Sequence, residues 1–380
     1  MPGGRKRLLV DNRVLMVAAV AAVGVASLAS GSAAADTGAV AASLSSHVWG
    51  AAEEVPGTAA LNRGGAAEIG SVSCSSAGNC GAGGAYTDSS GRGQAFVVNQ
   101  VNGTWHTAIE VPGTAALNQG GNAEIGSVSC SSAGNCTAAG DYAPGSASEQ
   151  AFVVSQINGT WRTAIKVPGT AALNQGGIAG IAVSCGSAGN CSAGGHYTDS
   201  SGRDQAFVVN QVNGTWHTAI EVPGTAALNR GGYADIGSVS CSSAGNCSAG
   251  GSYLPSLGHV QVFVVSQING TWHTAIEAPG TAALNQGKDA AIFSVSCASA
   301  GNCSAGGYYA SSRASDQAFV VNQVNGTWHT AIEVPGTAAL NRGGTAFINS
   351  VSCAAAGNCS AGGAYTDSSG RGQAFVDSET

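Results

Sequence analysis

The chain has 380 residues, of which 9% are charged, and its formal net charge at pH 7 is −7. Binding to a phosphate backbone requires clustered lysine and arginine side chains, and 14 basic against 21 acidic residues exclude nucleic acid as a partner. Glycine supplies 58 residues, a content that can indicate disorder, but regularly spaced Val, Ile, Phe and Trp positions provide the apolar faces of a folded domain.

The N-terminus has the pattern of a secretory signal peptide. Basic residues precede a nearly continuous apolar run over residues 14–29, and small residues at 33–35 suit cleavage. The run is too short and too rich in alanine and glycine for a membrane span. We therefore expect residues 1–35 to be removed, residues 36–46 to form a short flexible lead-in, and the protein to be secreted without a membrane span.

Six tryptophans mark a sequence repeat. Their separations are 56, 56, 55, 56 and 56 residues, and they are Trp49, Trp105, Trp161, Trp216, Trp272 and Trp328. The residue missing from the third unit falls between 178 and 183. A period of this size is typical of propellers and repeat arrays.

Each unit predicts four antiparallel strands. In the first full unit we expect them at residues 69–74, 80–86, 94–101 and 104–111. Asn102-Gly103 is a strong signal for a two-residue hairpin, because both central positions of that turn need a positive φ. Residues 58–67 have no clean period and contain adjacent glycines, so we expect a long connection there.

Twelve cysteines form six C-x5-C pairs, one in each unit. An even, paired set in an exported chain indicates disulfides, and zinc sites prefer a shorter spacing with a second pair of ligands. We expect each pair to close the hairpin between the first two strands, at Cys74–Cys80, Cys130–Cys136, Cys185–Cys191, Cys241–Cys247, Cys297–Cys303 and Cys353–Cys359.

The two ends of the repeat indicate how the units are arranged. The repeat begins with a lone fourth strand around residues 47–55 and ends with a third strand at 373–376. A linear solenoid would need capping units, and none is visible. We predict an all-β fold, a six-bladed β-propeller over residues 47–380 with four antiparallel strands per blade, closed by the N-terminal strand pairing with the last blade.

The repeated motifs carry a family resemblance. Ser-Val-Ser-Cys-x-x-Ala-Gly-Asn-Cys, the following Gly-Gly-x-Tyr, and Asn-Gly-Thr-Trp together resemble repeats of secreted, Ala/Gly-rich actinobacterial proteins of the β-propeller class, over residues 47–380. The resemblance implies a fold and export. Residues 155–161 are loosely similar to the Asp-box of sialidase-type propellers. The likeness of this chain to sialidase-type and WD-repeat-like propellers is looser than its likeness to the actinobacterial repeats. That box places one residue between its Asp or Asn and its Gly, whereas none intervenes here, so turn chemistry explains the match.

The turn after each repeated tyrosine differs most between copies. Drift in a solvated loop explains this variation, and so does recognition of a ligand by this face, because tyrosine with aspartate, arginine and asparagine suits glycan or peptide binding. The candidate binding residues are Tyr86, Asp88, Arg92, Tyr142, Tyr197, Asp199, Arg203, Tyr253, Tyr309, Tyr365, Asp367 and Arg371, with Asn62 and Arg63 from the long connection. We expect them on the face opposite the cysteine turns.

Near-identical units argue against an active site. Catalysis needs one asymmetric constellation, whereas these units repeat each polar group around an axis, and no catalytic or phosphate-binding motif appears. We expect a monomeric, non-catalytic protein without cofactor or metal that binds a glycan or an extracellular protein through several weak, equivalent sites. The alternatives are an interaction scaffold and, as the third, a glycan-acting hydrolase or lyase.

Overall fold

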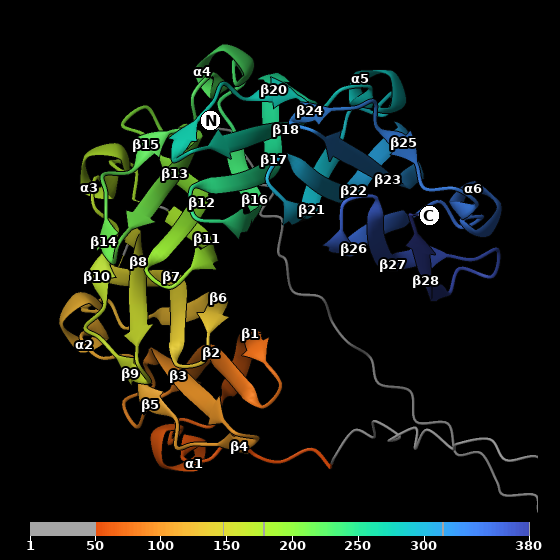
Figure 1. Cartoon of the computed structure of the whole chain (residues 1–380). Coiled ribbons are helices and arrows are strands. Elements are labelled where there is room, and N and C mark those ends of the chain that lie inside the picture. The colour runs from red at the N-terminus through yellow and green to blue at the C-terminus, as the bar shows by residue number, and fades with distance from the viewer. Residues whose placement is uncertain (1–50, 147, 178, 314, 380) are drawn as a thin grey trace, which may run out of the picture. The chain divides into compact units, whose positions relative to one another are not determined.

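Six antiparallel sheets follow one another along the chain (Figure 1). The computed structural model describes residues 51–146, 148–177, 179–313 and 315–379. The expected signal peptide, the lead-in and Trp49 lie outside the described residues. Among the described residues, no helix is long and apolar enough to cross a membrane.

Each sheet is called a blade and is numbered in chain order. Blade 1 contains β1 (Ala67–Ser76), β2 (Asn79–Thr87), β3 (Gly93–Val101), β4 (Thr104–Trp105) and β5 (Ile109–Glu110). Blade 2 contains β6 (Ala123–Ser132), β7 (Asn135–Gly145), β8 (Ser148–Ile157), β9 (Thr160–Trp161) and β10 (Ile165–Lys166). Blade 3 contains β11 (Ala179–Ser187), β12 (Asn190–Thr198), β13 (Asp204–Val212), β14 (Thr215–Trp216) and β15 (Ile220–Glu221).

The later blades repeat this order. Blade 4 contains β16 (Ala234–Ser243), β17 (Asn246–Ser256), β18 (His259–Ile268), β19 (Thr271–Trp272) and β20 (Ile276–Glu277). Blade 5 contains β21 (Ala290–Ser299), β22 (Asn302–Ser312), β23 (Ser315–Val324), β24 (Thr327–Trp328) and β25 (Ile332–Glu333). Blade 6 contains β26 (Ala346–Ala355), β27 (Asn358–Thr366) and β28 (Gly372–Ser378).

The expected fourth strand is split into two short pieces that both pair with the third strand. The backbone between them is held elsewhere, because the N–H of Ala108 donates to the Pro56 carbonyl in the preceding connection at 2.7 Å. Each long connection also contains a four-residue helix that the sequence did not predict. These helices are α1 (Thr58–Leu61), α2 (Thr114–Leu117), α3 (Thr170–Leu173), α4 (Thr225–Leu228), α5 (Thr281–Leu284) and α6 (Thr337–Leu340).

The predicted hairpins and disulfides are confirmed. Cys74 lies directly opposite Cys80 in the β1–β2 register, and the equivalent pair recurs in every blade. All six disulfides are formed, with Cα atoms 3.9–4.0 Å apart. Asn102 has a φ of 47°, as the two-residue hairpin requires.

A one-residue bulge interrupts the first strand of most blades. In blade 1 the register shifts between Ile69 and Ser71, which leaves Gly70 without an opposing residue. Blade 3 pairs without this shift from Ala179 to Cys185. The residue missing from the third unit is therefore the bulge residue.

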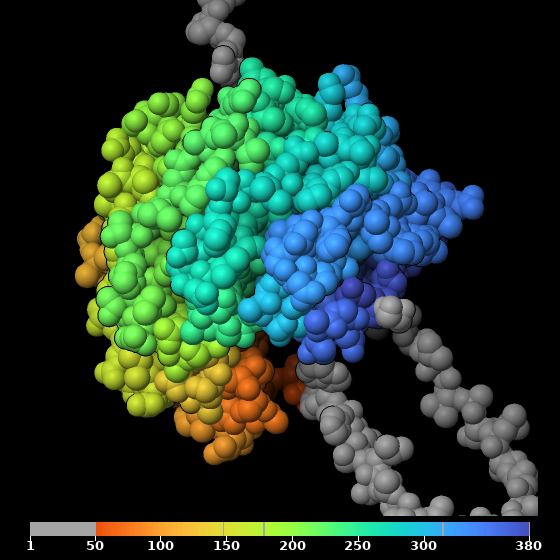
Figure 2. Space-filling view, turned by 45° about the horizontal axis from the view of Figure 1, so that its top comes forward, coloured from red at the N-terminus to blue at the C-terminus, as the bar shows by residue number. Residues whose placement is uncertain are grey.

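The cores lie between neighbouring blades. One face of blade 1, through Ala95 and Val97, packs with Ile125, Phe152 and Trp161 of blade 2, and equivalent clusters form between each later pair. Figure 2 shows consecutive segments side by side in the order of the sequence. A small-residue sheet thus buries its two faces by stacking on its copies.

The repeated Ser-Val-Ser-Cys motif links the first strands of successive blades. The Ser71 and Ser73 hydroxyls accept hydrogen bonds, each 3.0 Å long, from the N–H groups of Val128 and Cys130 in blade 2. Equivalent bonds join the later blades up to Ser296, whose hydroxyl accepts from Cys353. The all-β fold of six repeated blades is therefore confirmed. Residues 51–55 form no strand and blade 6 has three strands, so closure by the N-terminal strand stays a prediction.

Candidate functional site

The repeated tyrosines lie in the core. Tyr86, Tyr142, Tyr197, Tyr253 and Tyr309 are 2–4% exposed, and each packs against a phenylalanine of its own blade, as Tyr86 does against Phe96. Tyr365 of blade 6 is partly exposed and packs against Phe375. The Tyr86 and Tyr309 hydroxyls donate to Glu110 and Glu333 at 3.1 and 2.7 Å. Burial of the first five leaves no ring face on which a ligand could stack.

The aspartates of the tyrosine turns hold those turns in shape. Asp88 Oδ1 accepts from the N–H groups of Ser90 and Arg92 at 2.7 and 3.1 Å, and its Oδ2 accepts from Gln94. The Gln94 and backbone hydrogen bonds lower the pKa of Asp88. Asp199 and Asp367 make the same bonds. These aspartates have a structural reason to be present, without any ligand.

The remaining candidates do not converge on one place. Arg92, Arg203 and Arg371 are exposed at the tips of separate turns, and Arg63 is exposed with its Nε donating to Ala60 in its own connection. Asn62 accepts from the N–H of Gly65 at 3.1 Å. It also lines a crevice of about 290 Å³ against β1, with Glu54 and Ile69. The structure thus assembles no common site from these residues, and their role in binding stays a prediction.

Equivalent crevices lie between neighbouring blades on the side of the cysteine turns. Their volumes are about 210 Å³ between blades 2 and 3, 270 Å³ between blades 3 and 4, and 320 Å³ between blades 5 and 6. We call them the inter-blade crevices. Each is lined by the start of a second strand, the end of a third strand and the Ala-Gly of the next blade's cysteine turn, as at Ser192, Gln211 and Ala244. The sequence pattern predicted a candidate site on the opposite face.

Carboxamide and hydroxyl groups from adjacent blades meet in these crevices. The Ser192 hydroxyl donates to Gln267 Oε1 at 2.9 Å in the crevice between blades 3 and 4. Between blades 4 and 5, the equivalent bond runs from the Ser248 hydroxyl to Gln323 Oε1 at 3.1 Å. Each bond joins two blades. Apart from Glu379 between blades 5 and 6, the walls are therefore neutral and polar, and the disulfides and alanines beside them are apolar.

The crevice between blades 2 and 3 differs in one respect. Gln211 is 3% exposed, and its Oε1 has no hydrogen-bond partner among the described residues. The residue equivalent to Ser192 is Thr137, whose hydroxyl lies 3.4 Å from the Cys191 sulfur instead. A buried acceptor left unpaired costs about 1–3 kcal/mol, so this position is less favourable than its equivalents in the later blades.

Trp216, which lies opposite Gln211 in the strand register, also has a buried polar atom without a partner in the part of the chain that the structure describes. Its Nε1 has no partner among the described residues, whereas Trp161 donates to Asn99 Oδ1 at 2.8 Å. Ser155 replaces that asparagine, and its hydroxyl accepts from Gln211 Nε2 at 3.1 Å. The Gln211 Oε1 acceptor and the neighbouring Trp216 Nε1 donor thus both remain unpaired within the described part of the chain.

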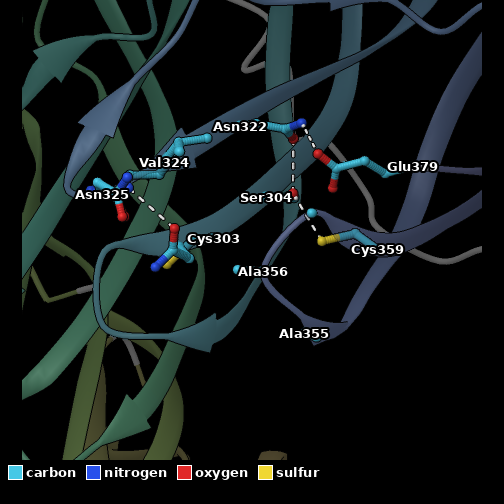
Figure 3. A pocket seen from close by; sticks show the side chains of 12 residues that line it. Cys303, Ser304, Asn322, Val324, Asn325, Ala355, Ala356, Cys359 and Glu379 are labelled. Atoms are coloured by element: carbon cyan, nitrogen blue, oxygen red, sulfur yellow. Dashed lines mark hydrogen bonds between the residues drawn. The ribbon is translucent and has the colours of Figure 1, made fainter.

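The crevice between blades 5 and 6 contains the one charged wall residue of the three (Figure 3). Glu379 Oε1 accepts from Asn322 Nδ2 at 2.9 Å, and Ser304 donates to Asn322 Oδ1 at 2.8 Å. In the crevice between blades 3 and 4, the position of Glu379 is taken by the neutral Gln267. The three crevices therefore share a framework and differ in charge.

Sequence reasoning missed these crevices because they are formed by three separate segments. Gln100 and its equivalents sit at the end of a strand, a position that alternation alone does not distinguish. The recurrence of Asn-Gln or Ser-Gln before every Asn-Gly turn was the available signal. Among the described residues, no group of three or more His, Cys, Asp or Glu side chains could hold a metal ion.

No family model and no curated protein matches this sequence. In structure the chain is similar to Hadza microbial sialidase Hz136, at 11% identity and a TM-score of 0.45, over 82% of this chain and 66% of that one, which is just under two thirds of its length. It is also similar to the Aleuria aurantia lectin in complex with alpha-methyl-L-fucoside, at 12% identity and a TM-score of 0.39, over 80% of this chain and 90% of the lectin.

A third similar structure is the β-propeller domain of the Trilobed protease from Pyrococcus furiosus, at 6% identity and a TM-score of 0.37, over 83% of this chain and 98% of that one. The activities in these names belong to those proteins. The similarity concerns the arrangement of antiparallel strands in repeated blades.

Proposed function

We propose that this protein is a secreted, non-catalytic binding module that recognises saccharides through its inter-blade crevices. The observation that carries this proposal is the recurrence of one crevice, with the same backbone frame, between three pairs of blades. A ligand that repeats along a polymer could occupy several crevices at once. Several weak contacts would then give useful avidity without a strong single site.

The chemistry of the walls suits a neutral, hydroxyl-rich ligand. Serine hydroxyls and glutamine or asparagine carboxamides both donate and accept, as sugar hydroxyls require. The apolar Ala188 and the nearby disulfide offer contact for the carbon side of a sugar ring.

Secretion is supported by the disulfides. Six are formed, and the described residues contain no free cysteine. Disulfides persist in oxidising compartments and are rare in the cytosol. An external location is also where polysaccharide ligands are abundant.

A glycan array with the mature protein tests the proposal, followed by a triple variant that fills the crevices. Ala188, Ala244 and Ala356 are exposed at the crevice walls, and their replacement by tryptophan should abolish binding to the saccharide found on the array. The matched control replaces Ala171, Ala226 and Ala338, which are exposed on the short helices, by tryptophan. A folded protein that binds no glycan, or equal binding by both triple variants, would overturn the proposal.

A further inference from the structure

Three aromatic side chains break the repeat near the first strands of blades 5 and 6. Phe293 packs on Tyr308 with ring centroids 5.6 Å apart, and on Phe347 at 6.4 Å. Phe293 is 38% exposed, and the other two are partly exposed. We call these three residues the aromatic patch. It lies nearer the long connections than the cysteine turns, away from the inter-blade crevices.

Packing of the fold does not require these aromatics. Phe293 occupies the bulge position, where blades 1, 2 and 4 have glycine. A Cβ at Gly70 or Gly237 would come within 2.4 Å of a carbonyl oxygen of the next blade, so glycine is the residue that suits this position. Likewise, Tyr308 is alanine in blades 1 and 6, at Ala85 and Ala364. Partly exposed aromatic side chains at positions where other blades have glycine, alanine or charged residues indicate a surface that contacts something else.

Acidic groups border the patch. The Tyr308 hydroxyl donates to Asp289 Oδ2 at 3.0 Å, and Asp289 is exposed. Burial and then the negative charge of Asp289 raise the pKa of Asp316. Lys288 is exposed beside Asp289, with a left-handed φ of 73°, at a position where the other connections have glycine. The patch therefore combines aromatic ring faces with carboxylates.

We propose that the aromatic patch binds an amino sugar, with the ring of the sugar stacked on Phe293 and Tyr308 and its ammonium group beside Asp289. Aromatic faces attract cations through the ring quadrupole and also contact the apolar face of a sugar ring. Asp289 supplies the opposite charge, which a neutral saccharide would not use. This site is independent of the inter-blade crevices.

Titration of the mature protein with a trimer of glucosamine, at a pH where its amines are protonated, tests this proposal. Phe293→Gly and Tyr308→Ala place residues of other blades in the patch, so the fold should be kept, and together they should weaken binding about tenfold or more. Asp289→Asn, which gives the residue at Asn122 of blade 2, should weaken binding about fivefold. Lys288→Gly removes a nearby positive charge and should strengthen it.

Three controls test whether binding of the trimer depends on the aromatic patch and on the charge of the amines. Glu68→Ala removes one negative charge from blade 1 and should leave binding of the trimer unchanged, as should tryptophan at Ala188, Ala244 and Ala356. The N-acetylated trimer, which lacks the charge, should bind at least about fivefold more weakly. The proposal is wrong if both trimers bind equally, if neither binds, or if a lysine tripeptide binds more tightly than the glucosamine trimer.

Discussion

Blades 1 and 2 have almost the same sequence but different surroundings. Ile125 of β6 is 1% exposed and Val128 is 7% exposed, whereas their equivalents in β1, Ile69 and Val72, are 39% and 55% exposed. The cores form between blades, so a blade completes its core only when a neighbour covers that face. The difference shows that stability comes from stacking more than from any blade alone.

The other end of the repeat agrees with this comparison. Val376 of β28 is 85% exposed, whereas Val97, its equivalent in β3, is fully buried. Ser350 and Ser352 are also exposed, whereas the hydroxyls of their equivalents in blade 1, Ser71 and Ser73, accept hydrogen bonds from the next blade. Equivalent side chains therefore contribute different amounts to the free energy of unfolding, depending on the blade that contains them.

The largest expected effect comes from the isoleucine pair. Ile125→Ala should lower the free energy of unfolding by about 3 kcal/mol, because it leaves a cavity in an inter-blade core. Ile69→Ala should cost about 1 kcal/mol or less, since the side chain is partly in solvent. Denaturant unfolding of both variants measures the difference. Equal losses would contradict the comparison and would show that the β1 face is covered in solution, as closure of the ring predicts.

The asparagine of the long connection should show a smaller contrast. Asn118 is 3% exposed, and its Nδ2 donates to the Gly93 carbonyl and to Gln94 Oε1, both at 2.9 Å. Its replacement by alanine should cost about 2 kcal/mol, because buried partners lose their hydrogen bonds. Asn62→Ala removes a single bond in a more exposed place and should cost about 0.5 kcal/mol. Thermal unfolding that ranks Asn62→Ala as the more damaging change would refute this contrast.

The last contrast is a loss of stability with rising pH, which arises at Asp141 of blade 2 and not at the equivalent position of blade 1. Burial, followed by the charges of Glu124 and Glu149, raises the pKa of Asp141 from 3.8 to about 8, and the equivalent residue in blade 1 is Ala85. As the pH rises, Asp141 loses its proton at a lower pH in the unfolded chain than in the folded protein. The free energy of unfolding should therefore fall as the pH rises from about 4 to about 8.

Asp141→Asn should remove that decline and stabilise the protein near neutral pH. Unfolding measured at pH 4, 6 and 8 follows the change. Asp88→Asn is the control of opposite sign. The pKa of Asp88 is lowered in the folded protein, so its carboxylate stabilises the fold at pH values above its pKa in the unfolded chain, and this stabilisation is lost as the pH falls. A variant of Asp141 with the same pH profile as the parent protein would contradict the prediction.

Local signals in the sequence were sufficient to predict the strands and turns of a single blade, but not the contacts between neighbouring blades. The Asn-Gly turns and the paired cysteines act between residues close in the chain, and both predictions are confirmed. The repeated tyrosine looked like a ligand contact because it borders a variable turn, yet its ring fills a core. Position along a strand does not reveal which face a second sheet will cover.

The crevices were hidden for the same reason. Ser192, Gln267 and the cysteine turn at Ala244 are separated by tens of residues and meet only when blades 3 and 4 stack. The unpaired Gln211 acceptor depends on a serine-to-threonine change in another blade. Such features follow from contact between repeats, which a single unit of the sequence does not contain.

The number of saccharide sites tests most directly whether the stacked blades form repeated binding crevices. Titration calorimetry with a short form of the saccharide identified on the array should give at least three similar sites per chain. Tryptophan at Ala188, Ala244 or Ala356 should each remove one of them, because each residue lines a different crevice. A single site per chain, or a site number that all three substitutions leave unchanged, would contradict the account.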